Sequence, residues 1–172
     1  ASSMGDGVIQ YKNGTPVQSY NEKNAFKETA GGYGSGYCYI DGLAFDKNGN
    51  LWMTSSEVNH AVLVLDKAGA WHRLDIEQLR GVYTINDILI TSTNDKWIYV
   101  PRNTPKLVMI PNSESLDEVS SYEFTTLIDT DGKELTPSNY TCVAEDKDGY
   151  IWVGTNRGAV YFTKPRLSLI HI

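Results

Sequence analysis

Residues 145–158, EDKDGYIWVGTNRG, gather the side chains that could hold a metal ion or a phosphate. The stretch contains three acidic residues, three glycines and a tryptophan. A calcium loop of the EF-hand kind needs glycine as its sixth residue and a carboxylate at its end, but here glycine stands fourth, counted from Asp146. No helix is predicted after the stretch, which argues against a phosphate loop. The pattern therefore predicts a structural turn, with no metal and no cofactor.

The same pattern recurs in the chain and indicates a repeat. GLAFDKNGNLWMTS (42–55) aligns without gaps with CVAEDKDGYIWVGT (142–155), and a degraded copy, DILITSTNDKWIYV, occupies 87–100. The tryptophans of the three copies are 45 and 55 residues apart. The matching positions are Asp46, Gly49 and Trp52 in the first copy, Trp97 in the second, and Asp146, Gly149 and Trp152 in the third.

Each copy predicts a β-hairpin. Alternating apolar residues precede the turn, and a strand centred on tryptophan follows it. Aspartate can accept backbone N–H groups in such a turn, and glycine supplies the positive φ. Third strands are expected at 61–65, 106–110 and 159–162, and fourth strands at 71–74 and 121–127. The fold class is therefore all-β: a β-propeller fragment of about three and a half four-stranded antiparallel blades.

We expect residues 1–166 to form this partial propeller, with blade remnants near 5–39, 40–84, 85–139 and 140–164. The remainder of a longer chain would then complete it. Residues 167–172, LSLIHI, do not fit the pattern. One codon set for them resembles the transposon-end adaptor used in sequencing libraries, so we expect a non-native tail. The alternative is a genuine final strand that pairs with a neighbouring blade.

Composition narrows the function. Fifteen Lys and Arg against twenty-one Asp and Glu give a net charge of −6, and no basic cluster is present, which argues against nucleic acid as a partner. No stretch reaches the roughly 20 apolar residues of a membrane span. The start of the chain has no signal-peptide pattern, so we expect a removed leader or a fragment. Two cysteines are too few for a disulfide framework.

DKDGYIWVGTNRG closely resembles the two-component regulator propeller repeat, whose typical form is D-x-x-G-x-[IL]-W-[IV]-G-T-x-x-G-[LV]. The first copy keeps the aspartate, glycine and tryptophan but has Met-Thr-Ser where the family prefers Val/Ile-Gly-Thr. Such repeats occur in extracytoplasmic sensors of hybrid two-component systems in Bacteroidetes and in PorZ-type surface propellers linked to type IX secretion. In the third copy the residues that match the pattern are Asp146, Gly149, Trp152, Gly154, Thr155 and Gly158.

The resemblance implies a non-catalytic module at the cell surface or in the periplasm, which senses a ligand or binds a protein. Residues 40–66 also look like a blade of the NHL, gluconolactonase or streptogramin-lyase type. Those families include enzymes that hold a divalent metal in the central channel. None of the three histidines lies in a recognisable catalytic or metal pattern, so the enzyme is the second hypothesis.

Loop lengths predict where a ligand would bind. The D-x-x-G turns share one face, whereas the variable loops 28–39, 54–60, 101–106, 128–139 and 155–158 share the other. Two tyrosines there could stack on a sugar or a peptide, or pack between blades. Two arginines could meet an anionic group or remain solvated. The candidates for binding a glycan, peptide or protein ligand are Tyr33, Tyr37, Arg102, Asn103, Asn156 and Arg157.

Overall fold

The computed structural model describes residues 1–26, 36–128 and 131–163, and they are almost entirely β-structure. The helical part of the described chain is one 3-10 turn, η1 (Glu77–Leu79). The all-β prediction is confirmed. The chain divides into two compact units, Ala1–Ile88 and Leu89–Ile172. Tyr33 and the tail 167–172 lie outside the described residues.

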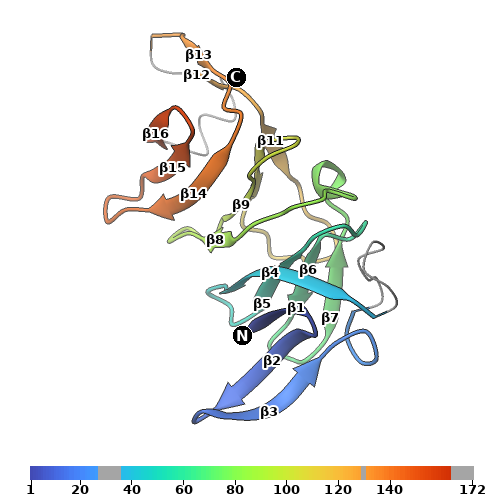
Figure 1. Cartoon of the computed structure of the whole chain (residues 1–172). Helices are drawn as coiled ribbons and strands as arrows, with labels where there is room; N and C mark the ends of the chain where they lie inside the picture. The colour runs from blue at the N-terminus through green and yellow to red at the C-terminus, as the bar shows by residue number, and fades with distance from the viewer. Residues whose placement is uncertain (27–35, 129–130, 164–172) are drawn as a thin grey trace. The chain divides into compact units, whose positions relative to one another are not determined.

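The first unit contains an antiparallel sheet of four consecutive strands (Figure 1). They are β4 (Cys38–Phe45), β5 (Leu51–Ser55), β6 (Val62–Leu65) and β7 (Trp71–Leu74). Trp52 is in the second strand, as the repeat predicts. β4 also pairs with β1 (Ser2–Gly5), which leads through β2 (Gly7–Lys12) to β3 (Thr15–Tyr20). β2 lies within the segment near 5–39 where the sequence predicts a blade remnant.

Apolar side chains between these strands form the core of the first unit. In β4 and β5, alternate side chains point to the same face of the sheet. Val8 and Phe26 pack on that face from the N-terminal segment, and Trp71 packs edge-on against Phe26, with ring centroids 5.4 Å apart. The buried members of this cluster are Val8, Ala25, Phe26, Cys38, Ile40, Met53 and Leu63.

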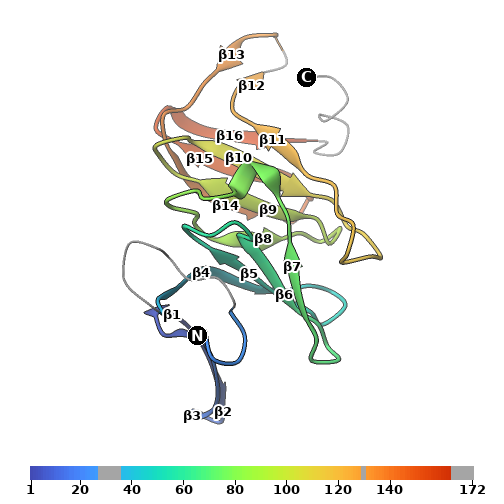
Figure 2. The ribbon, with the colours of Figure 1, turned by 90° about the vertical axis from the view of Figure 1, so that its right-hand side faces the viewer.

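The second unit stacks two antiparallel sheets (Figure 2). One consists of β8 (Ile88–Ile90), β9 (Lys96–Val100), β10 (Lys106–Ile110) and β11 (Tyr122–Phe124). The other consists of β14 (Tyr140–Glu145), β15 (Ile151–Thr155) and β16 (Gly158–Phe162). Between them lies a core of Trp97, Tyr99, Leu107, Met109, Phe124, Leu127, Tyr140, Ile151 and Val153.

The fourth strand of the middle copy is shorter than predicted. The sequence predicts a strand over 121–127, but β11 ends at Phe124, where its register with β10 ends at Leu107. The chain then leaves the sheet and forms a separate hairpin of β12 (Leu127–Ile128) and β13 (Glu134–Leu135). Alternation alone cannot show where the partner strand stops.

Candidate functional site

The first acidic turn joins β4 to β5, and the carboxylate of Asp46 accepts four hydrogen bonds there. Its Oδ1 accepts the backbone N–H groups of Asn48 (2.8 Å) and Asn50 (2.9 Å). Its Oδ2 accepts the Asn50 amide and the indole Nε1–H of Trp52, both at 2.9 Å. Gly49, with φ of +85°, closes the turn by donating its N–H to the carbonyl of Asp46. One carboxylate thus fixes both the turn and the tryptophan.

The third copy repeats this geometry. Oδ1 of Asp146 accepts the N–H groups of Asp148 (2.9 Å) and Tyr150 (3.0 Å), and Oδ2 accepts Nε1–H of Trp152 (2.7 Å). Gly149 has φ of +82°. The same types at the same spacing therefore form the same turn.

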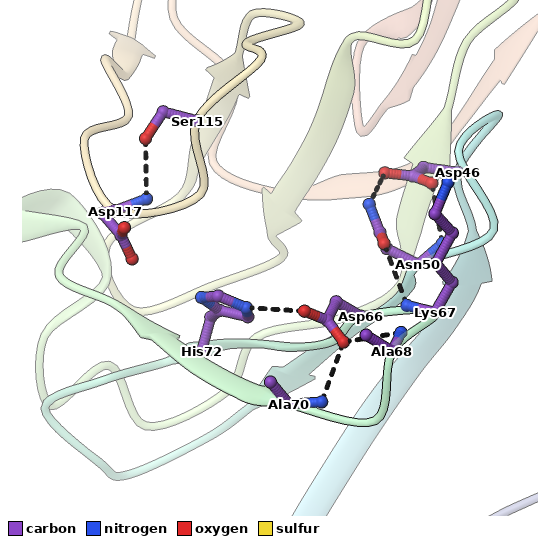
Figure 3. Close-up of polar contacts among 9 residues, drawn as sticks. All are labelled: Asp46, Asn50, Asp66, Lys67, Ala68, Ala70, His72, Ser115 and Asp117. Atoms are coloured by element: carbon purple, nitrogen blue, oxygen red, sulfur yellow. Dashed lines mark hydrogen bonds and ion pairs between the residues drawn. The ribbon is translucent and has the colours of Figure 1, made fainter.

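Sequence reasoning missed a further turn of this kind, between β6 and β7. Oδ1 of Asp66 accepts the N–H groups of Ala68 (2.9 Å) and Ala70 (2.8 Å), while Oδ2 lies 3.2 Å from Nε2 of His72 (Figure 3). Gly69 has φ of +91°. The signal was the D-K-x-G spacing at 66–69, with histidine at the position that tryptophan takes elsewhere.

The degraded copy keeps the turn without the aspartate. Thr91 replaces it, and Oγ1 of Thr91 accepts the N–H of Asp95 (3.0 Å). Asn94 replaces the glycine and adopts the same positive φ, +66°. Asparagine tolerates this region better than most residues, so the backbone turn survives the loss of both signature residues.

Neighbouring turns are also joined to each other. The N–H of Lys67 donates to Oδ1 of Asn50 (3.2 Å), which connects the β4–β5 and β6–β7 turns (Figure 3). In the second unit the N–H of Asn112 donates to Oδ1 of Asp95 (2.8 Å) at the corresponding position. These bonds hold together the turns at one end of the strands in each sheet.

The pKa values of the turn aspartates agree with a structural role of these residues. Burial alone would raise the pKa of Asp46, but hydrogen bonds from Trp52, Asn50 and Asn48 outweigh it and hold the pKa below the ordinary value. The indole hydrogen bond is the largest cause of the lowered pKa of Asp146. No group of three His, Cys, Asp or Glu side chains in the described part of the chain is arranged to share a metal ion. The acidic motif is built as a hydrogen-bonded turn.

The opposite end of the β4–β7 sheet carries a different cluster, at the start of β4 and the end of β5. The rings of Tyr37 and Tyr39 meet edge to face, with centroids 6.3 Å apart. Burial is the main cause of the raised pKa of Tyr39, and the charges of Asp41, Tyr37, Glu57 and Tyr83 raise it further. Each of these four groups is therefore within electrostatic reach of Tyr39, and the five side chains are treated as one group. We call them the tyrosine–acid cluster.

Asp41 is held by a buried hydroxyl. Oγ of Ser56, which is fully buried, donates to Oδ2 of Asp41 at 2.7 Å and accepts the N–H of Ile85 at 2.9 Å. Burial raises the pKa of Asp41 to about 6, although the Ser56 hydrogen bond opposes the shift. Because the pKa of Asp41 is about 6, a charged or hydrogen-bonding group placed beside this carboxyl group can change its charge near neutral pH.

Glu57 is the strained member of the cluster. It has φ of +63°, a conformation rare for residues other than glycine, and its N–H donates to the carbonyl of Val82 at 2.8 Å. Its Oε1 is buried and has no hydrogen-bond donor within the described chain. Buried carboxylate oxygens are normally paired, so this atom departs from the usual pattern.

The structure separates the sequence-based candidates. Tyr37 belongs to the first unit and takes part in the cluster just described. Asn156 holds the chain in place, because its Oδ1 accepts the N–H groups of Ser138 (3.0 Å) and Asn139 (3.2 Å). Arg102 and Arg157 are exposed in the β9–β10 and β15–β16 turns of the second unit.

Asn103 is used for its backbone, with φ of +69° in the β9–β10 turn. The N–H of Tyr140, at the start of β14, donates to the carbonyl of Pro101 at 3.0 Å, which places this turn beside β14. Sequence reasoning did not single out Tyr39, Asp41, Glu57 or Tyr83. Loop 54–60 is one of the variable loops, and Glu57 is its one acidic residue. This residue is the only signal in the sequence that points to the cluster.

Residues 134–157 match the family model described as two component regulator propeller. The chain carries a two-component regulator propeller repeat. The matched residues include the turn of Asp146 and the tryptophan that it holds. The resemblance inferred from the sequence is thus confirmed for the third copy. No curated protein matches the chain.

Solved structures show the fold. The structure of PorZ, a surface component of the type IX secretion system of Porphyromonas gingivalis, is 17% identical, with a TM-score of 0.88 over 98% of this chain and 23% of that chain. A streptogramin B lyase is 17% identical, with a TM-score of 0.50 over 73% of this chain and 41% of that chain.

The extracellular domain of a protein described as a hybrid two component system from B. thetaiotaomicron is 15% identical. Its TM-score is 0.48, over 92% of this chain and 25% of that chain. This chain thus spans about a quarter of the PorZ chain, and its fold is that of a propeller segment. No helix in the described residues is long and apolar enough to cross a membrane.

Proposed function

We propose that this chain is part of a non-catalytic, extracytoplasmic propeller that binds a ligand through the tyrosine–acid cluster. The observation that carries the proposal is the grouping of aromatic and acidic side chains: the rings of Tyr37 and Tyr39 meet edge to face, and the charges of Asp41, Glu57 and Tyr83 act on Tyr39. The repeat and the propeller fold support it, because such scaffolds bind through the loops at the ends of their sheets.

The chemistry of the cluster selects a ligand rich in hydrogen-bond donors. Two carboxyl groups accept but do not donate when ionised, and tyrosine faces attract cations and sugar rings. The basic side chain of a peptide or protein, or the hydroxyl groups of a glycan, has this complement. Anionic ligands are disfavoured, because the ionised carboxyl groups of Asp41 and Glu57 would repel them. The exposed arginines of the second unit remain candidates for a separate anionic contact.

Peptide and glycan arrays probed with the purified chain test the proposal. Glu57→Gln and Tyr37→Ala should each weaken binding at least about tenfold, which corresponds to 1.4 kcal/mol. Glu114→Gln and Tyr11→Ala are matched controls, because both residues are exposed and lie outside the cluster. Equal affinity in all four variants would contradict the proposal, provided that their melting temperatures agree.

The second hypothesis is an enzyme of the streptogramin-lyase or gluconolactonase type. The fold similarity to a streptogramin B lyase keeps it under test. Purified chain should be assayed for lyase and lactonase turnover with and without added divalent metal. Turnover that depends on the metal and is lost on chelation would favour the enzyme over the binding function.

A further inference from the structure

The chain contains the tripeptide Lys-Asn-Gly twice, and the two copies have different surroundings. One copy is at 12–14, in the turn between β2 and β3, and the other is at 47–49, in the turn between β4 and β5. When glycine follows asparagine, the backbone nitrogen of the glycine can attack the side-chain amide, because glycine has no Cβ to hinder the approach. Since the neighbours in the two copies are identical, a difference in reactivity between them must come from the fold.

The β2–β3 turn leaves its central residues, Asn13 and Gly14, in solvent. Lys12 pairs with Thr15, so the turn has two residues, and their φ values of +52° and +79° are those of a type I′ turn. Both residues are exposed, and a Cβ built on Gly14 would meet no atom within 4 Å. Within the described residues, neither the side-chain amide of Asn13 nor the N–H of Gly14 has a hydrogen-bond partner.

The strands beside this turn bury little surface near it. β3 is the edge strand of its sheet and pairs with β2 alone (Figure 1). Every residue of β3 from Thr15 to Ser19 is exposed, and so is Tyr11 in β2. Opening of the tip of this hairpin therefore disrupts few contacts, and segments of that kind open with a small free energy. Such an opening lets the Gly14 nitrogen rotate toward the side chain of Asn13.

The β4–β5 turn holds the same tripeptide firmly. The N–H of Gly49 donates to the carbonyl of Asp46 at 3.1 Å, and the N–H of Asn48 donates to Oδ1 of Asp46 at 2.8 Å. Asp46 also accepts the indole N–H of Trp52, which is buried. Freeing the Gly49 nitrogen therefore breaks several hydrogen bonds beside a buried tryptophan, so the side chain of Asn48 is protected although it is exposed to solvent.

From this contrast we propose that Asn13 is a site of spontaneous covalent modification in the folded chain, with water as the co-reactant, and that Asn48 is not. The nitrogen of Gly14 gives its proton to the solvent and attacks Cγ of Asn13. The new N–Cγ bond closes a succinimide ring, and the side-chain nitrogen takes up a proton and leaves as ammonia. Water then opens the ring at either carbonyl, which gives aspartate or isoaspartate. The net reaction is amide plus water to acid plus ammonia, without oxidation or reduction.

The two products should affect the hairpin differently. Aspartate keeps the main chain unchanged and tolerates a positive φ, so it adds a negative charge and leaves the turn in place. Isoaspartate carries the main chain through its side chain, and the added methylene lengthens a turn whose length fixes the strand register. β3 ends at Tyr20, which pairs with Val8 and packs edge-on against Trp71, with centroids 5.5 Å apart. Isoaspartate formation at Asn13 should therefore loosen the pairing that brings Tyr20 to the core.

Ageing of the purified chain in mildly alkaline buffer made with heavy-oxygen water tests the proposal. Peptide mass spectrometry should show heavy oxygen entering at least about tenfold faster at Asn13 than at Asn48, because breaking about two hydrogen bonds slows opening by this factor or more. In urea the two sites should react at the same rate. Asp46→Ala should accelerate the reaction at Asn48 and leave the rate at Asn13 unchanged. Aged chain that contains isoaspartate should melt at a lower temperature than the Asn13→Asp variant, which carries the charge without the longer turn.

Several results would overturn the proposal. One is equal incorporation at Asn13 and Asn48 in the folded chain, or faster incorporation at Asn48. Another is a folded chain in which Asn13 stays intact while both sites react in urea, which would mean that the β2–β3 turn also protects its asparagine. A preference for Asn13 that persists in urea would place the cause in the sequence and not in the fold.

Discussion

At the scale of single residues, an aspartate determines the geometry of its turn. Asp46 is almost fully buried and accepts two backbone N–H groups, an amide and an indole N–H. Asp46→Ala would leave these donors unpaired and should lower the free energy of unfolding by about 2–4 kcal/mol, since each lost hydrogen bond costs on the order of 1 kcal/mol. Urea unfolding measures the change. Asp46→Asn retains acceptor oxygen and should cost less, and equal costs would contradict this account.

The same saturation of the carboxylates predicts no response to calcium. Both oxygens of Asp46 and Asp146 already accept hydrogen bonds, and the ligand spacing of a calcium loop is absent. The melting temperature of the chain should therefore be unchanged across a calcium titration. A clear rise that Asp46→Ala and Asp146→Ala abolish would show that the turns bind the metal.

Asp41 should make stability depend on pH in the opposite sense from the turn aspartates. Its folded pKa of about 6 lies above the unfolded value near 3.9. The protonated form therefore favours the folded state, and its stabilisation is present below about pH 4 and lost as the pH rises through about 6. Asp41→Asn removes this dependence. The melting temperature of the variant minus that of the unmodified chain should therefore increase from pH 4 to pH 7.5. A difference that does not change with pH would argue against the shifted pKa.

At the scale of elements, equivalent tryptophans have different surroundings. Trp97 lies in the core between two sheets, so Trp97→Ala should cost about 3–5 kcal/mol. Trp152 is 40% exposed in this chain, and Trp152→Ala should cost clearly less. Chemical denaturation of the two variants provides the comparison. Equal losses would mean that Trp152 is covered in solution by something outside the described residues.

Many of the strands and turns can be predicted from the sequence. The alternation before each turn and the tryptophan after it predict β4–β5, β8–β9 and β14–β15, because local pattern and turn chemistry agree there. The turn at Asp66 was missed since histidine replaces tryptophan. The exposure of Trp152 could not be predicted, because burial depends on what packs against a strand and not on the strand itself.

At the scale of the whole molecule, the sequence predicts the fold class better than the site. Spacing of 45 and 55 residues is enough to indicate propeller sheets, and the fold similarity to PorZ agrees. The tyrosine–acid cluster depends on the start of β4, the end of β5 and the segment after η1, and only folding brings these together. The strained backbone of Glu57 leaves no mark in the sequence, since glutamate is an ordinary loop residue.

The two ends of the β4–β7 sheet differ: acidic turns build the fold at one end, and the tyrosine–acid cluster that we propose as the ligand site lies at the other. Hydrogen exchange of the chain, measured with and without the tightest ligand from the peptide and glycan arrays, tests this separation directly. Added protection should appear at 37–41, 54–60 and 82–85, and the turns at 46–50, 66–70 and 146–150 should not change. Protection centred on those turns, or absent from the cluster, would contradict the account.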